Sequence, residues 1–387
     1  MSVVRLGRPA KVDIDLDTVP REVTEQDEVI YRRLVSTDLT DEQVRRAEEP
    51  AGTFDRQLQV LAVHWHQEFI PLQHVRTRIA RLFPNREEEL IIPTQHNVLT
   101  SYDGHIGVEV DCYSAGFNRK VQLLVHFASD RLEGRGDVFR GMLDHTFKYR
   151  SSQLFQFLDY LLEPQFDDHV NEAARDTWAD DDVIGFARAH GARLKELIEK
   201  HWRSTPPEMV KNKLLRNFVD EHRETFGDAV IDHVQVFLRA LKMIVKRDFA
   251  LDYFYKTEEV IDEVRSLGGG VVIPHPEQFW PVLLDELDID GIEVWNPQSF
   301  EYTEFLIDVV IRKNRTRERG DRPILITMGD DCHMGEKVKD PRSQDPEKAG
   351  REVGVQPPWD DLNIRKSLIT AKADRGNLIR EYRARLA

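Results

Sequence analysis

The sequence feature that most constrains the fold of this chain is a series of seven short apolar runs, each ending in polar or metal-binding side chains. Runs of this length and composition are typical of buried strands. In chain order they are QLQVLAVHWH, ELIIPTQHN, HIGVEVD, VQLLVHF, GGVVIPHP, DGIEVWNP and PILITMGDDCH. We therefore predict seven strands, placed in the first and last thirds of the chain.

The sequence between the fourth and fifth runs has helical periodicity instead, for example in FARAHGARLKELIEKHW and VIDHVQVFLRALKMIVKRDF. We predict a helical insertion over about residues 128–265, with a break at 205-TPPE-208. It lies inside a barrel domain over residues 58–340. A polar N-terminal arm occupies residues 1–57, with a helix start at Thr40, and a tail at 341–387 closes with two helices.

Strands that alternate with helical patterns favour an α/β fold of largely parallel β/α units that close into a barrel. In such barrels the catalytic groups collect at the carboxyl ends of the strands. The unusual polar residues of this sequence fall at those ends, so the same pattern that predicts the fold also predicts where the site lies.

The composition of the chain limits which molecules it binds and in which compartment we expect it. The 387 residues carry a formal net charge of -15, and such a field repels nucleic-acid backbones and anionic membranes. An anionic substrate therefore needs a local positive site, which bound metal ions supply. Cys112 and Cys332 are the two cysteines of the chain, too few for a disulfide framework. No apolar stretch suits a signal peptide or a membrane span, so we expect a cytoplasmic protein.

His64 and His66 end the first apolar run at positions i and i+2. On a strand this spacing puts both side chains on one face, where both imidazoles can reach a single ion. Neutral imidazole is the commonest metal ligand in proteins. The alternative is that both are hydrogen-bonded core or rim residues.

The next three runs each carry one candidate ligand: His96, Glu109 and His126. A buried carboxylate is costly unless a cation or a hydrogen-bond donor compensates it. Because Glu109 lies among apolar residues, we expect such a cation or donor beside it. After the insertion come His275, and then Asp331 and His333 at the same two-residue spacing as the first pair. Eight candidate ligands thus lie at the ends of six predicted strands, in a chain with 14 histidines.

The ordered motifs resemble those of the polymerase and histidinol phosphatase (PHP) family of metal-dependent phosphoesterases. The matching pieces are HWH, TQHN, GVEV, VHF, IPHP, GIEVWN and GDDCH, over about residues 58–128 and 260–336. The resemblance implies a distorted seven-stranded (β/α)7 barrel of the TIM type that holds up to three divalent ions.

The resemblance also implies an assignment of the ligands. One ion would be bound by His64, His66, Glu109 and Asp331. A second would be bound by His96 and His333, and a third by Glu109, His126 and His275. Glu109 would then bridge two ions, as a carboxylate can and an imidazole cannot.

This sequence departs from the family pattern at three positions. Leu72 stands where the family usually has a further ligand, so that either Glu68 or His74 takes its place or the second ion binds weakly. Gln95 replaces an aspartate of the family's T-D-H motif. Asp330 replaces a serine, and its added charge either tightens metal binding or faces solvent.

Four further residues near the motifs are not included among the eight candidate ligands. Glu293 lies in a segment that in this family is often a wall of the site. Trp295 and Asn296, which follow it, either touch substrate or pack in the core, and packing is the expected role of Trp295. Cys332 should point away from the ions and act as a small buried residue.

The mechanism that we expect is hydrolysis of a phosphate mono- or diester by a metal-bound hydroxide, with two or three ions clamping the phosphoryl oxygens. A donor set rich in imidazole suits zinc, manganese or iron better than magnesium or calcium. His64, His66, Glu109, Asp331 and His333 would be central to catalysis. The expected substrate is a phosphorylated small molecule or a nucleotide.

Two alternatives remain open from the sequence alone. The first is a metal-dependent exonuclease acting on nucleic acid. The basic runs KNKLLR at 211–216 and KMIVKR at 242–247 either form its groove or are outer helix faces. The second is a non-catalytic scaffold subunit of the same fold, with the arm, the insertion and the tail as surfaces for an unidentified protein partner.

Overall fold

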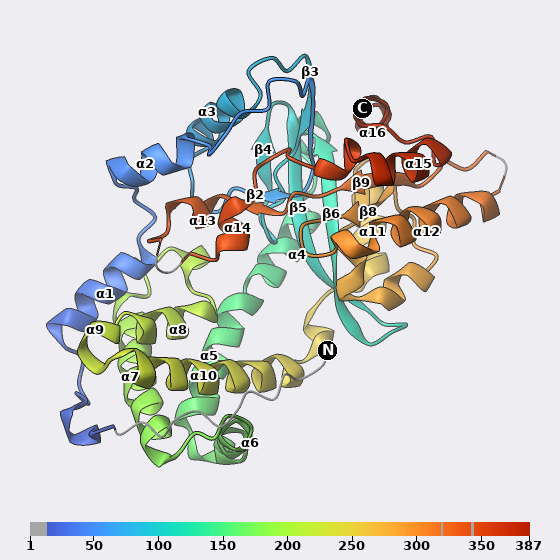
Figure 1. Ribbon diagram of the computed structural model, residues 1–387. Helices are drawn as coiled ribbons and strands as arrows, with labels where there is room; N and C mark the ends of the chain where they lie inside the picture. Colours follow the sequence, from blue (N-terminus) through green and yellow to red (C-terminus); the bar gives the residue numbers. More distant parts are fainter. Residues whose placement is uncertain (1–13, 319, 342–343) are drawn as a thin grey trace. The chain divides into compact units, whose positions relative to one another are not determined.

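The computed structural model describes residues 14–318, 320–341 and 344–387 (Figure 1). The chain forms two compact units. The first, called here the helical unit, comprises Met1–Asp38 and Lys148–Ala250. The second, called here the sheet unit, comprises Leu39–Phe147 and Leu251–Ala387. The first thirteen residues of the predicted N-terminal arm lie outside the described residues.

All seven apolar runs contain strands, as predicted, and all of these strands lie in the sheet unit. Two of the runs are divided, so that the first run contains β1 and β2 and the last contains β9 and β10. A short strand that the apolar pattern did not predict, β4, precedes β5. The strands are β1 Gln59–Ala62, β2 Trp65–His66, β3 Glu88–Ile91, β4 Thr100–Tyr102, β5 His105–Ser114, β6 Arg119–Ala128, β7 Gly270–Ile273, β8 Gly291–Trp295, β9 Leu325–Met328 and β10 Cys332–His333.

The pairing of the strands is mixed, which corrects the expectation of largely parallel units. Six strands form one sheet in the order β4-β5-β6-β7-β8-β9. Its pairs are antiparallel from β4 to β7 and parallel from β7 to β9. Only residues 115–118 separate β5 from β6. A parallel pair needs a crossover of a dozen or more residues, so a link this short forces a hairpin.

Two further sheets of two strands each are parallel, β1 with β3 and β10 with β2. Within the described ranges the strands are therefore divided among three sheets, and a closed seven-stranded barrel is not found. Short contacts do link the sheets. The amide of Asp331 donates to the carbonyl of His64 at 3.0 Å, and His96 forms an isolated parallel bridge with Glu109.

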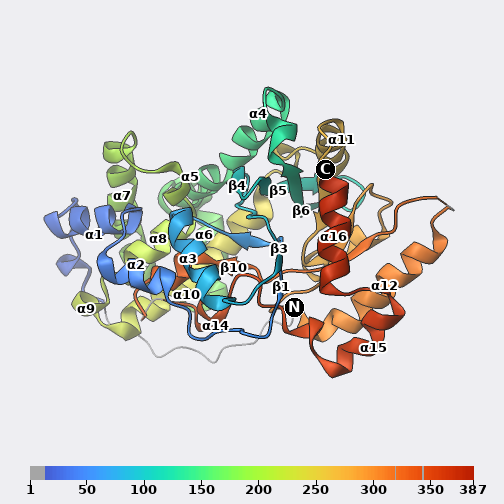
Figure 2. The ribbon, with the colours of Figure 1, turned by 90° about the horizontal axis from the view of Figure 1, so that it is seen from above.

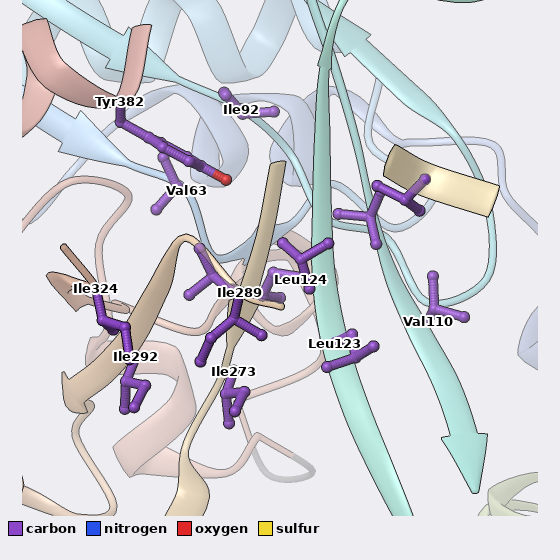
Figure 3. Close-up of a cluster of buried hydrophobic side chains, with 14 of the residues drawn as sticks. Val63, Ile92, Val110, Leu123, Leu124, Ile273, Ile289, Ile292, Ile324 and Tyr382 are labelled. Atoms are coloured by element: carbon purple, nitrogen blue, oxygen red, sulfur yellow. The ribbon is translucent and has the colours of Figure 1, made fainter. Parts of the chain in front are cut away.

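The core of the sheet unit consists mainly of branched aliphatic side chains from these strands, several of which are drawn in Figure 3, where Val63 lies beside Tyr382. Tyr382 comes from the last helix, and Gly270 of β7 makes room for it. A Cβ at Gly270 would lie 2.8 Å from the Tyr382 hydroxyl oxygen. The C-terminal helix is therefore part of the core.

The helices of the sheet unit include the two that were predicted for the tail, α15 and α16. The predicted start at Thr40 is confirmed by a capping box, in which the Thr40 hydroxyl accepts from the amide of Gln43 at 3.3 Å. The helices are α2 Asp41–Glu48, α3 Leu72–Leu82, α4 Asp137–Phe147, α11 Thr257–Ser266, α12 Thr303–Thr316, α13 Met334–Val338, α14 Pro346–Gly350, α15 Leu362–Thr370 and α16 Arg375–Leu386.

Helix α16 lies against strands of the sheet unit (Figure 2). Charged contacts as well as its apolar face hold it there. The Arg385 side chain, 4% exposed, pairs with Asp290 at 3.3 Å, and Arg380 pairs with Glu88 at 3.2 Å. Basic residues of the tail therefore contact acidic residues of the same chain, and the Arg385 side chain is not a solvated one.

The helical unit contains Lys148–Ala250 of the stretch predicted as a helical insertion, together with α1, and has a core of its own. The predicted break separates α7 from α8, with a short 3-10 turn at Pro207–Met209. The helices are α1 Glu25–Val35, α5 Tyr149–Leu162, α6 Asp167–Thr177, α7 Asp181–His201, α8 Lys213–Asp220, α9 Arg223–Phe226 and α10 Asp228–Asp248. No helix among the described residues is long and apolar enough to cross a membrane.

One carboxylate is fully buried in the helical unit. Asp27 accepts from the amide of Thr24 at 2.9 Å, and it lies 3.5 Å from Arg193 and 3.4 Å from His222. Burial opposes ionisation of Asp27, but the hydrogen bonds from His222 and Thr24 and the charge of Arg193 outweigh it and lower its pKa to about 2. This acidic group therefore stays ionised inside an apolar core.

Candidate metal centre

His66 lies on β2, and His64 directly precedes this strand. Both are buried, and their ring centroids are 5.5 Å apart. The Nε2 atoms of His64 and His66 lie 3.7 Å and 3.4 Å from the same oxygen, Oδ1 of Asp331. The predicted consequence of the two-residue spacing, that both imidazoles reach one point, agrees with this geometry.

Glu109 lies on β5 between two buried valines, and its side chain is 1% exposed. Its Oε2 atom is 2.5 Å from Nδ1 of His96 and 3.6 Å from Nε2 of His66. Its Oε1 atom is 3.5 Å from Nε2 of His275. The two oxygens of this carboxylate thus face different histidines.

Seven of the eight predicted ligands come together in three overlapping groups whose potential ligand atoms lie within 4.8 Å of one another. The overlap matters because a shared residue places two groups side by side. The groups are His66, His96 and His333; His64, Glu109 and His275; and His64, His66 and Asp331.

Several ring nitrogens in the cluster are buried without a hydrogen bond. Among the described residues, Nε2 of His64 and both ring nitrogens of His66 lack a partner of suitable geometry. Buried polar atoms in proteins are nearly always hydrogen-bonded, and a bound metal ion is a group that would engage these nitrogens. Burial, together with the charges of His333 and His96, lowers the pKa of His66 to about 3, which leaves a neutral imidazole.

Glu293 lies behind His64 and not at the centre of the cluster. Its Oε2 atom is 2.6 Å from Nδ1 of His64, and its Oε1 atom accepts from the amide of His275 at 3.0 Å and from the side chain of Asn296 at 3.2 Å. A carboxylate in this position orients a ligating histidine and sets its tautomer. A Cβ at Gly329 would lie 2.0 Å from Glu293 Oε2, so only glycine leaves room for this pair.

The electrostatics of the cluster favour a cation. Burial opposes protonation of His64, but the nearby carboxylates of Glu293 and Asp331 outweigh it and raise the pKa of His64 to about 10. A positive charge at this point is therefore stabilised by the surrounding acidic groups.

The backbone is unusual at three positions of the site. Glu68, His275 and Asp331 have φ of 53°, 26° and 46°. Positive φ at residues other than glycine costs about 1–3 kcal/mol and clusters at functional sites, where surrounding structure imposes it. Asp331 thus holds its carboxylate toward the histidines at some cost in backbone energy.

His126 does not join the other seven, contrary to the expectation that it binds a third ion. Its Nε2 donates to the carbonyl of Val63 at 2.9 Å, and its Nδ1 accepts from the Tyr382 hydroxyl at 2.6 Å. Burial lowers the pKa of His126 to about 3, in keeping with a neutral ring. Both ring nitrogens are engaged, so His126 is a core residue in this structure.

Leu72 and its two possible substitutes, Glu68 and His74, lie at different places relative to the cluster. Leu72 begins α3 and packs at the edge of a hydrophobic cluster. His74 forms a contact of 2.8 Å with Glu48 and belongs to none of the three groups. Glu68 has one oxygen 3.5 Å from Nδ1 of His333 and the other accepting from the amide of Gly335. Of the two candidates, Glu68 is the one beside the site.

Asp330 has a role that neither alternative anticipated. It is buried, and its two oxygens accept from the amides of Cys332 at 3.1 Å and Gly354 at 2.8 Å. Burial raises its pKa to about 7, although both hydrogen bonds oppose the shift. Through these two hydrogen bonds Asp330 connects the tail, at Gly354, to the segment that carries Asp331 and Cys332. Cys332 is buried, as expected, and Trp295 packs in the core.

Arg351, in the tail, is a site residue that the sequence did not single out. Its Nη1 atom lies 2.6 Å from Oδ2 of Asp331, and its side chain is 3% exposed. Asp331 therefore presents Oδ1 to the histidines and Oδ2 to a buried guanidinium. Nothing in the local sequence marks this arginine among the 54 basic residues of the chain.

Solvent reaches three of the candidate ligands more than the others. The side chains of His96, His333 and Asp331 are 21%, 17% and 10% exposed, whereas those of His64 and His66 are 1% exposed. A substrate would approach the three partly exposed residues.

The two basic runs lie elsewhere, on and next to α8 and α10 of the helical unit. Burial, together with the charges of Lys246 and Arg216, lowers the pKa of Lys242 to about 8. These residues are therefore close enough for their charges to oppose protonation of Lys242.

Fold and site together define an α/β protein with a buried cluster of imidazoles and carboxylates. No family model and no curated protein matches the sequence. Among solved structures, one similar chain is a protein from Bifidobacterium adolescentis that is provisionally named a metal-dependent phosphoesterase. It is 14% identical, with a TM-score of 0.36, and the match covers 84% of this chain and 99% of that one. A likeness this distant does not establish a shared fold or function, so the site has to be judged by its own residues.

Proposed function

We propose that this chain is a metal-dependent phosphoesterase of the PHP type, which hydrolyses a phosphate ester of a small molecule or nucleotide. The observation that carries the proposal is the convergence of seven predicted ligands, from strands far apart in sequence, into three overlapping groups. These seven residues were chosen from the sequence as metal ligands. Binding to shared metal ions explains why they lie together.

The donor set fits two or three divalent ions. Imidazole nitrogens with a bridging carboxylate suit zinc, manganese or iron. His64, His66 and Asp331 would hold one ion, and His96 and His333 would hold another together with His66 or Glu68. Glu109 and His275 would complete a further position. When bound, such ions activate water and neutralise the charge of a phosphoryl group.

The protein's own residues have separate tasks in this scheme. Glu293 keeps the proton of His64 on Nδ1, so that Nε2 offers its lone pair to the cluster. Arg351 holds one oxygen of Asp331 and leaves the other free to bind. The partly exposed edge formed by His96, His333 and Asp331 would admit the phosphate.

The arrangement of strands is compatible with a distorted barrel of the kind this family has. The hydrogen bond from Asp331 to His64 joins the β9–β10 segment to the β1–β2 segment, and the bridge of His96 with Glu109 joins β3 to β5. These contacts would complete a ring through the three sheets, with the candidate ligands gathered where the strands end.

The proposal is tested by metal content and hydrolysis measured on the same samples. The native protein should bind manganese or zinc stoichiometrically and hydrolyse p-nitrophenyl phosphate with Mn²⁺. His66→Ala and Asp331→Ala should each lose metal and lower kcat by about 100-fold or more. His74→Ala is the matched control, because His74 belongs to no group, and it should retain both properties.

Two outcomes would contradict the proposal. Native protein without bound metal after saturation with zinc or manganese would remove its basis. Stoichiometric metal without hydrolysis of monoesters, diesters or dinucleotides would favour the non-catalytic scaffold instead.

A further inference from the structure

Glu68 lies between β2 and α3, and both oxygens of its carboxylate face one short segment, residues 333–335. Its Oε1 atom lies 3.5 Å from Nδ1 of His333, and its Oε2 atom accepts from the amide of Gly335 at 2.8 Å. A Cβ at Gly335 would lie 2.2 Å from Oε2, so glycine leaves the room that this carboxylate occupies. Glu68 therefore contacts both the ring of a candidate ligand and the backbone beside it.

The ring of His333 presents its two nitrogens to different groups. Nε2 lies 3.3 Å from Oδ1 of Asp331, the oxygen that also faces Nε2 of His64 and of His66. Nδ1 faces Glu68 instead. A neutral imidazole carries one proton, and a carboxylate that accepts at Nδ1 keeps the proton there and leaves the lone pair of Nε2 for a metal ion. Glu68 itself belongs to none of the three groups of potential ligands.

A second histidine of the cluster has the same arrangement. Glu293 places Oε2 2.6 Å from Nδ1 of His64 and accepts from the amide of His275 through Oε1. In both pairs one carboxylate oxygen faces Nδ1 of a candidate ligand, and the other accepts from a backbone amide. Two carboxylates thus face the outer nitrogens of two histidines whose Nε2 atoms face the same aspartate oxygen.

The backbone at Glu68 is held in a costly conformation. Its φ of 53° lies in the left-handed region, which costs about 1–3 kcal/mol at residues other than glycine. The side chain of Gln95 accepts from the Glu68 amide at 3.2 Å and so supports this turn. Gln95 directly precedes His96, which shares a group of potential ligands with His333. A strained residue held by its neighbours at the edge of a ligand cluster indicates placement for function.

We propose that Glu68 is a positioning residue, which keeps the proton of His333 on Nδ1 so that Nε2 binds the ion shared with His66 and His96. Glu68 does not bind that ion itself. This inference rests on the metal centre of the proposed function. The alternative, in which Glu68 replaces the ligand expected at Leu72, needs a carboxylate oxygen on the Nε2 side of the ring, whereas Oε1 lies beside Nδ1.

The native protein provides the first test. Protein labelled with ¹⁵N-histidine is loaded with zinc, and long-range ¹H–¹⁵N spectra report which nitrogen of each ring binds metal and which carries a proton. The signals of His333 are assigned by their absence from the spectrum of His333→Ala. We expect zinc on Nε2 and the proton on Nδ1. Zinc on Nδ1 of His333 would overturn the inference.

Two variants disturb the contact from opposite sides. In Glu68→Gln the carbonyl oxygen is needed by the Gly335 amide, so the NH₂ group faces Nδ1 of His333, which is also a donor. We expect one of the bound zinc ions to bind about tenfold more weakly, the low end of the effect of losing such a carboxylate, because the Glu68 side chain is 23% exposed. Gly335→Ala should have the same effect with Glu68 retained, since the new Cβ displaces its carboxylate. Zinc titrations against a competing chelator measure both.

Glu48→Gln is the matched control. Glu48 is 25% exposed and lies 2.8 Å from Nδ1 of His74, so the substitution makes the same change against a histidine that belongs to no group. It should alter zinc affinity by less than about twofold.

Cobalt separates positioning from direct binding, because its visible absorption reports the atoms that coordinate it. Cobalt-loaded Glu68→Ala should keep the band positions of the native protein. Bands that indicate a changed donor set would show that Glu68 is a ligand and would overturn the inference. Zinc affinities within about twofold of native for both Glu68→Gln and Gly335→Ala would also overturn it. Native protein that binds no zinc contradicts the proposed function and this inference together, whereas zinc binding without hydrolysis contradicts the proposed function alone.

Discussion

Replacing Glu293 by glutamine tests how the candidate centre is held together. The glutamine is nearly isosteric, so packing around the 1% exposed side chain should be kept. Its carbonyl oxygen is still needed by the amide of His275 and the side chain of Asn296, both of which donate to Oε1. The new NH₂ group then faces Nδ1 of His64, where the native carboxylate accepts a hydrogen bond at 2.6 Å.

Two donors cannot share a hydrogen bond, so His64 must either break the contact or move its proton to Nε2. In both cases the lone pair that Nε2 offers to the cluster is lost or misdirected. Loss of a carboxylate that orients a metal-binding histidine weakens metal affinity by about 10- to 100-fold. We expect this loss for Glu293→Gln, equal to about 1.4–2.7 kcal/mol of binding free energy.

The measurement is a zinc titration by calorimetry with a competing chelator, on native protein, on Glu293→Gln and on Glu304→Gln. Glu304 is an exposed residue of α12, and its substitution should not change affinity. A near-ultraviolet dichroism spectrum checks that the tertiary packing is retained. If Glu293→Gln keeps its fold and binds zinc within twofold of the native affinity, Glu293 does not position His64 and the reasoning fails.

Three further predictions concern other contacts. Gly329→Ala should weaken zinc binding at least as much as Glu293→Gln in the same titration, because its Cβ would lie 2.0 Å from Glu293 Oε2 and 2.7 Å from Nδ1 of His64. Tyr382→Phe should destabilise the sheet unit by about 1–3 kcal/mol, since it leaves a buried nitrogen of the β6 histidine without its partner, yet should leave the metal content unchanged. Asp27 has a folded pKa of about 2 against an ordinary value of 3.8, so its charge contributes about 2 kcal/mol of stability that is fully present above about pH 4 and is lost as pH falls toward 2. Hydrogen exchange of α1 should show this loss in native protein, whereas Asp27→Asn should have lower protection at pH 6 and little further loss from pH 4 to 2.

The strands and the set of candidate ligands could be proposed from the sequence because both have local signals. Seven apolar runs mark the strands, and polar residues at their ends mark the candidate ligands, including the pair at His64 and His66 with its two-residue spacing. Strand periodicity determines which side chains share a face, and that requires no knowledge of distant contacts. The hairpin of β5 and β6 was also readable in principle, since the link of residues 115–118 is too short for a crossover.

What tertiary structure decided is the partner of each polar group. His126 has the same strand-end signal as the other candidate ligands, but a tyrosine 256 residues away occupies one of its nitrogens. Arg351 has no local signal, yet it holds the carboxylate of Asp331. Spacing along the chain specifies which way a side chain points, whereas its hydrogen-bond partner depends on what packing brings within 3 Å. The sequence by itself therefore determined the set of candidate ligands, and the packing of the tail decided which of them face a common point.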